Sequence, residues 1–209
     1  MILKRKATLL ALIVVLFFPA MAAAMDPMES IKAPIDAFIV ILNDPQYQVP
    51  GARSAQREAI WKTVRPMFDF EEVARRTVAR HWRDFSESEK VQFKDVFAEF
   101  LGNTYIEKIQ GEYHNEQIVY LGQDFFSDLF AEVKTQVVRQ TLQTPVNYRM
   151  LKGADGQWRV YDVIVEGVSL VQNYRTQFAS SLRRETPAQL IQRLSERLDE
   201  QSQRLADPN

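Results

Sequence analysis

The segment PVNYRMLKGADGQWRVYDVIVEG, residues 145–167, decides the fold. Apolar and polar residues alternate at its start, with Val146, Tyr148 and Met150 on one side, which predicts a strand over 145–151. The turn-forming residues KGADG follow, and a second apolar stretch runs from there towards the end of the segment. The segment is therefore predicted to form a β-hairpin.

The second strand of this hairpin, predicted over 157–165, is apolar on both faces. Simple alternation assigns its apolar residues to two faces, Trp158, Val160 and Ile164 on one and Tyr161, Val163 and Val165 on the other. A strand with two apolar faces has to be covered on both sides, so we expect other elements of the chain to pack there.

Two further strand patterns precede the hairpin, at residues 118–121 and 131–140, so the sheet is predicted to be a four-stranded antiparallel meander. Helical patterns flank it. Four come before the sheet, starting near residues 26, 52, 69 and 86, and two follow it, starting near 168 and 186. This order predicts an α+β fold, with a helical layer packed on a curved, mainly four-stranded antiparallel sheet.

The N-terminal residues 1–24 have the layout of a signal peptide. Lys4, Arg5 and Lys6 precede an apolar run that ends at Pro19, and small residues follow it. Cleavage is expected after Ala24, with cleavage after residue 22 as the alternative, or an uncleaved anchor if the leader is retained. The remaining residues, 25–209, are long enough for a single domain with its own core.

The composition excludes several classes of protein. Residues 1–24 carry three of the 26 Lys and Arg and no acid, so the rest of the chain has 23 basic and 27 acidic residues. A mildly acidic chain with interspersed charges does not favour nucleic-acid binding. The absence of Cys excludes disulfides, thiol catalysis and thiolate metal sites.

The candidates for catalysis are few. His81 and His114 have no spacing that joins them to carboxylates, so no metal site is predicted. Glu72 is expected to close a capping box opened by Asp69 rather than to act in an acid–base pair. Asp162 or Glu166 could be a general base beside an apolar pocket, or a rim charge, or a structural partner of an arginine.

Three stretches resemble the MlaC-type proteins, also called toluene-tolerance auxiliary proteins of ABC transporters. They are FDFEEVARR at 68–76 with His81-Trp82-Arg83, residues 86–105, and WRVYDVIVEGVSL at 158–170 continued by QNYR at 172–175. The resemblance covers roughly residues 28–200, and it is carried by the order and spacing of the stretches together with the signal peptide.

The resemblance implies a non-catalytic periplasmic phospholipid carrier without cofactors, which contributes to the lipid asymmetry of the outer membrane. Such proteins exchange glycerophospholipid between an outer-membrane lipoprotein complex and an inner-membrane ABC transporter complex with its membrane-anchored substrate-binding subunit. The acyl chains are implied to enter an apolar pocket between helices and sheet.

The resemblance also suggests which residues contact lipid. The expected wall residues are Phe97, Phe100, Leu101, Tyr105, Tyr148, Met150, Tyr161, Val163, Val165, Val168 and Leu170. Which of them line a pocket and which fill the core stays open, because an apolar stripe has the same spacing in both cases. The basic cluster of Arg75, Arg76, Arg80 and Arg83 is expected to be a solvated face, with pairing to a lipid phosphate or a partner as the alternative.

Three other functions remain possible on the sequence alone. The same walls could hold another apolar lipid, such as a hopanoid. A small α+β enzyme could use Asp162 or Glu166 as its base. A structural module could act through the C-terminal amphipathic helix, which begins near Pro187.

Overall fold

The computed structural model describes residues 26–206. The predicted signal peptide, residues 1–24, lies outside this range, so its boundaries and those of the domain 25–209 stay predictions. Within the described range no helix is both long and apolar enough to cross a membrane.

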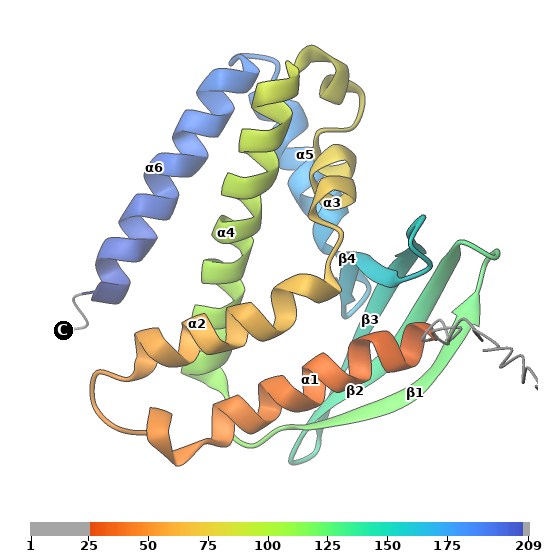
Figure 1. Ribbon diagram of the computed structural model, residues 1–209, viewed down its shortest axis with the longest axis vertical. Helices are drawn as coiled ribbons and strands as arrows, with labels where there is room; N and C mark the ends of the chain where they lie inside the picture. The colour runs from red at the N-terminus through yellow and green to blue at the C-terminus, as the bar shows by residue number, and fades with distance from the viewer. Residues whose placement is uncertain (1–25, 207–209) are drawn as a thin grey trace, which may run out of the picture.

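The sheet is an antiparallel meander whose strands lie in chain order (Figure 1). Its strands are β1 (Gln117–Phe125), β2 (Phe130–Arg139), β3 (Leu142–Lys152), β4 (Trp158–Val165) and the short β5 (Val168–Ser169). The predicted α+β class and four-stranded meander are confirmed, and β5 adds a fifth strand. Val168, expected to begin a helix, lies in β5 instead, and the helix begins at Leu170.

Strand β1 is longer than the predicted 118–121 because it continues past an irregularity. Its register against β2 shifts between Tyr120 and Gly122, and Gly122 has a φ of 153°. A glycine tolerates the local geometry of such a bulge, and the strand pairs regularly again as far as Phe125.

A second bulge changes the faces of β4. Val160 pairs with Met150 and Val163 pairs with Tyr148, which leaves Tyr161 as the extra residue. Directly paired residues share a face, so residues 158, 160, 163 and 165 all lie on one face and Ile164 lies on the other. The face assignment by simple alternation was therefore wrong beyond Val160, because the bulge inserts one residue into the period of two.

The helices begin and end close to their predicted positions. They are α1 (Pro27–Asn43), α2 (Arg53–Val64), α3 (Phe70–Val78), α4 (Glu87–Glu112), α5 (Leu170–Ser181) and α6 (Pro187–Ala206), with 3-10 turns at Pro45–Tyr47, Arg65–Met67 and Ala79–Asp84. Ser86 and Glu89 form both bonds of a capping box at the start of α4. At the start of α6, the Thr186 N–H donates to the Gln189 side chain, and the Gln189 N–H donates to the Thr186 hydroxyl.

The helices form two groups (Figure 1). Helix α1 lies across one face of the sheet, where Ile31 and Ile35 share a core with Val133, Met150 and other strand residues. Helices α3, α4, α5 and α6 pack together around a second, aromatic core. Helix α2 lies between α1 and α4, and a third cluster joins these three helices. The space between the three cores is where the candidate site lies.

Candidate functional site

An apolar cavity of about 550 Å³ lies between α1, α2, α4 and the sheet. This volume falls within the range of small-molecule binding sites, roughly 300–1,000 Å³. Of its lining residues only five carry charge, namely Lys108, Glu112, Glu116, Arg139 and Asp162. The interior is therefore suited to a ligand with a large apolar part.

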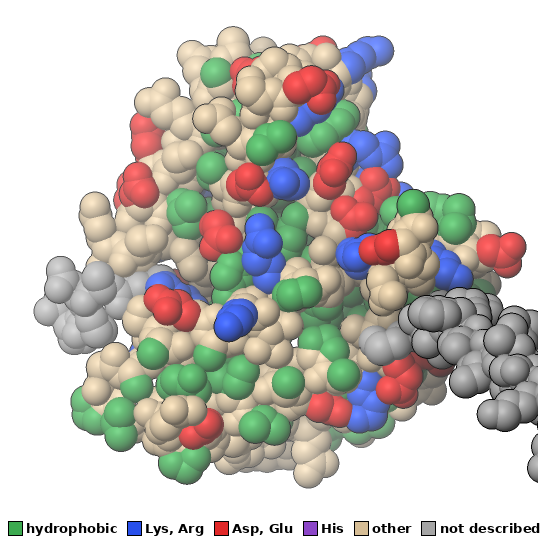
Figure 2. Space-filling model, in the orientation of Figure 1, with side chains coloured by type: hydrophobic (Ala, Val, Ile, Leu, Met, Phe, Trp, Pro, Cys, Tyr) green, Lys and Arg blue, Asp and Glu red, His purple; other side chains and the backbone are tan. Residues whose placement is uncertain are grey.

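Helix α1 provides one wall. Ile35, Phe38, Ile39 and Leu42 line the cavity at a spacing that places them on one side of the helix. Gln56 of α2 fixes the end of this wall, since its side-chain amide donates to the carbonyl of Ile41 at 3.1 Å. Hydrophobic side chains also gather on the outer surface over α1 and α2 in Figure 2.

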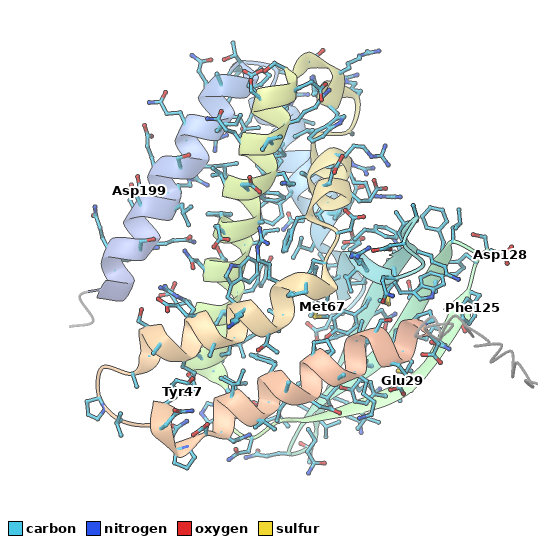
Figure 3. All side chains as sticks on the ribbon, in the orientation of Figure 1. Glu29, Tyr47, Met67, Phe125, Asp128 and Asp199 are labelled. Carbon is cyan, nitrogen blue, oxygen red and sulfur yellow. The ribbon has the colours of Figure 1, made fainter. Side chains whose placement is uncertain are left out.

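Helices α2 and α4 form the next wall and meet very closely. The indole of Trp61 lines the cavity, and its Nε1 donates to the Glu99 carboxylate at 3.0 Å. The opposing residue on α4 is Gly102, whose missing side chain leaves room for the indole. Met67 closes the end of α2 on the side of the sheet (Figure 3).

The sheet supplies the remaining wall. Val146, Tyr148, Val163 and Val165 lie on the same face of β3 and β4 and all line the cavity. This continuous apolar surface depends on the bulge at Tyr161, which keeps the last residues of β4 turned to the cavity. Burial raises the pKa of Tyr148 to about 12, so its hydroxyl stays neutral at physiological pH.

The cavity opens to solvent at one end. Tyr105, Ile109, Leu142 and Val165 line it and are also exposed on the surface, which marks the mouth. They come from the C-terminal half of α4, the start of β3 and the end of β4. Lys108 and Glu112 lie in the same part of α4, Glu116 follows in the α4–β1 connection and Arg139 ends β2. The mouth therefore combines an apolar collar with a charged rim.

The structure places seven of the eleven expected wall residues at the cavity. These are Leu101, Tyr105, Tyr148, Tyr161, Val163, Val165 and Leu170. Phe97 and Phe100 belong to the aromatic core of the helical group, where Phe97 meets Phe178 edge to face. Met150 is fully buried beneath α1, and Val168 is 64% exposed in β5.

Helices α1 and α2 also contribute walls, which were not predicted from the sequence. Ile35, Phe38, Ile60, Trp61 and Val64 line the cavity, and none of them is among the eleven expected wall residues. Their apolar spacing did signal an inward stripe, but the same spacing arises whether the stripe meets a cavity or another side chain.

Asp162 is buried and bonded to neighbouring parts of the protein. It is 5% exposed, and its carboxylate accepts hydrogen bonds from the Ser169 hydroxyl at 2.7 Å and the Val171 N–H at 3.0 Å, at the first turn of α5. Arg149 lies 3.7 Å from the same carboxylate. Glu166 is exposed in the β4–β5 turn, with a φ of 50°. Of the roles considered for Asp162, these contacts with Ser169, Val171 and Arg149 support the structural one.

The basic cluster is only partly a solvated face. Glu72 is buried and binds Arg75 at 2.7 Å and Arg76 at 2.6 Å. Arg76 also stacks over the ring of Tyr161, 4.1 Å from its centroid. The expected capping box was therefore wrong in one half: Asp69 accepts from the N–H of Glu72, but the Glu72 carboxylate binds the two arginines.

Among residues 26–206, no group of three His, Asp or Glu side chains is arranged to hold a metal ion. His81 instead contacts Asp84 at 3.0 Å, and His114 contacts the carbonyl of Glu112.

The fold and the site define an α+β protein with a ligand-sized apolar cavity that is open at a charged rim. The family model of the MlaC protein matches residues 32–196, so the chain belongs to the MlaC family. This confirms the family resemblance seen in the sequence. A comparison with curated proteins gives no significant match.

A solved structure shares the fold. It is the phospholipid-binding protein from Ralstonia solanacearum in complex with a phospholipid. The TM-score is 0.72 at 23% sequence identity, and the match covers 85% of this chain and 99% of that chain. At this identity the likeness establishes the common architecture.

Proposed function

We propose that this chain is a periplasmic phospholipid carrier that shields acyl chains in the cavity while the headgroup stays at the mouth. The observation that carries the proposal is the apolar cavity of about 550 Å³ with charged residues at its mouth. Family membership and the phospholipid bound to the Ralstonia solanacearum protein of the same fold support this choice of ligand.

The energetics explain why such a cavity is needed. Two acyl chains have on the order of 30 methylenes, and each is worth ~0.8 kcal/mol when it is removed from water. An unshielded lipid would therefore cost ~20 kcal/mol or more to move through an aqueous gap. A carrier lowers this cost by replacing water with apolar walls, and it requires no reactive group.

The proposed lipid contacts follow from the lining. Leu101, Tyr105, Tyr148, Tyr161, Val163, Val165 and Leu170 are the contacts retained from the sequence, with the residues of α1 and α2 added to them. Phe97, Phe100 and Met150 are proposed to support these walls from behind.

The location and partners extend the same proposal. Residues 1–24 would direct export and be removed. The carrier would then exchange phospholipid between an outer-membrane lipoprotein complex and an inner-membrane ABC transporter complex with its membrane-anchored substrate-binding subunit, without a catalytic step.

Native mass spectrometry of gently purified protein, combined with lipid extraction, tests the proposal. The expected result is a bound glycerophospholipid that can be stripped and loaded again from vesicles. Protein that is always empty and accepts no phospholipid would overturn it. A polycyclic lipid in the extract would instead assign the cavity to a hopanoid-like cargo.

A further inference from the structure

We infer that the cavity rim selects a zwitterionic headgroup, with Lys108 binding the lipid phosphate and Glu112 binding a headgroup ammonium. This inference rests on the proposed function, since it names the class of phospholipid that the same cavity prefers. It starts from the five charged residues that line the cavity.

Three of these five residues are already engaged within the protein. Asp162 accepts hydrogen bonds from Ser169 and Val171. Glu116 lies 3.6 Å from Arg139 and also accepts from the N–H of His114 at 2.7 Å. These groups are therefore largely compensated before a ligand arrives.

Lys108 and Glu112 differ from the other three. Both side chains are exposed at the mouth, and neither takes part in an ion pair or a side-chain hydrogen bond with any residue of the described range. They lie four residues apart on α4 and so occupy neighbouring positions on its surface, with Cβ atoms about 5–6 Å apart. A cation and an anion that no ion pair or side-chain hydrogen bond holds in place thus lie side by side at the mouth.

This arrangement complements a headgroup with both charges. The phosphate and ammonium of an ethanolamine headgroup are joined by two carbons, so the two charges are separated on the same scale as the two side chains. The rim as a whole holds two cations, Lys108 and Arg139, and two anions, Glu112 and Glu116. A headgroup with net negative charge would satisfy Lys108 but leave Glu112 facing like charge.

The size of the preference follows from the exposure of these groups. Exposed ion pairs contribute little, and their usual contribution corresponds to a factor of at most about five in affinity. We therefore expect a modest enrichment that weakens as salt screens the rim.

The test loads stripped mature protein from vesicles of equimolar phosphatidylethanolamine and phosphatidylglycerol with identical acyl chains, at low salt. Native mass spectrometry then measures the total bound lipid and the ratio of the two. The protein is expected to hold about two to five times more phosphatidylethanolamine. Glu112→Gln should bring the ratio close to one, and Lys108→Gln should lower the loading of both lipids. Arg183→Gln, an exposed change in the α5–α6 connection, is the control and should change neither.

The outcomes separate the two proposals. If both lipids load but the ratio is one, or if Glu112→Gln leaves the ratio unchanged, the headgroup inference is wrong while the carrier proposal stands. If neither lipid loads, both are wrong. Circular dichroism of each variant shows whether the fold is intact.

Discussion

Gly102 of α4 lies directly against the indole of Trp61 of α2. A methyl group on the Gly102 α carbon would come within 2.9 Å of ring atoms Cε3 and Cζ3 of Trp61, closer than carbon atoms normally approach. Trp61 is also a wall of the cavity, and Glu99 holds it by a hydrogen bond to its Nε1. The glycine therefore sets how far this wall can retreat from the cavity.

Gly102→Ala should therefore displace the indole of Trp61 and lower the free energy of unfolding. Overpacking typically costs ~1–3 kcal/mol, whereas alanine in a helix gains up to ~1 kcal/mol over glycine. Gly111→Ala in the same helix is the matched control, because its new methyl would meet only Arg53 Nη2 at an ordinary 3.5 Å. Urea unfolding should show Gly102→Ala to be less stable than the control by ~1–3 kcal/mol. Equal free energies of unfolding for the two variants would mean that Trp61 can be displaced without loss of stability.

Filling the cavity from β2 tests the ligand site. Val137 lines the cavity, and Val138 points to the opposite face of the same strand. Val137→Phe should lower the phospholipid bound per protein severalfold, because the larger ring occupies the space of the acyl chains. Val138→Phe should leave loading unchanged. Native mass spectrometry of both variants measures this, and equal loading would place the lipid elsewhere.

The buried Glu72 is expected to stabilise the helical group. Glu72→Ala removes the carboxylate that Arg75 and Arg76 share, and charge-assisted hydrogen bonds contribute ~1.5–3 kcal/mol. The free energy of unfolding should fall by about that amount. Glu71→Ala controls for the loss of a first-turn acid, because the neighbouring Glu71 is exposed. A similar small loss in both variants would show that the Glu72 carboxylate contributes no more to stability than the exposed Glu71.

Asp162→Asn distinguishes a structural role from a catalytic one. The carboxylate receives hydrogen bonds from the Ser169 hydroxyl and the Val171 N–H, and an amide cannot accept both in the same way. The free energy of unfolding should drop by ~1–2 kcal/mol while phospholipid loading persists. Glu166→Gln, in the exposed β4–β5 turn, should change neither quantity. Unchanged stability combined with the loss of a chemical turnover would instead support an enzyme.

The order of elements could be predicted from local patterns because each boundary is encoded within a few residues. Asp26, Ser86 and Thr186 cap helices at three of the predicted starts, and the hairpin turn follows from KGADG at 152–156. Such signals act between neighbours in the chain, so no tertiary information is needed to find them.

The faces of β4 and the walls of the site could not be predicted in this way. The bulge at Tyr161 depends on the pairing partner Met150, and alternation in one strand does not show it. Phe97 and Ile35 have equivalent apolar spacing in their helices, yet one packs in a core and the other lines the cavity. What separates them is the arrangement of distant elements, which local periodicity does not encode.

The meeting of three separate cores around one cavity has a consequence for the lifetime of the protein. The walls from α1, α4 and the sheet face one another across the cavity, so a lipid bound there would contact all three parts at once. Any ligand that binds only the folded chain stabilises it, by ~2.7 kcal/mol at a concentration a hundred times its dissociation constant. If the cavity binds lipid as proposed, empty molecules would be the first to unfold and meet a protease, and the supply of lipid would regulate how much of the protein survives.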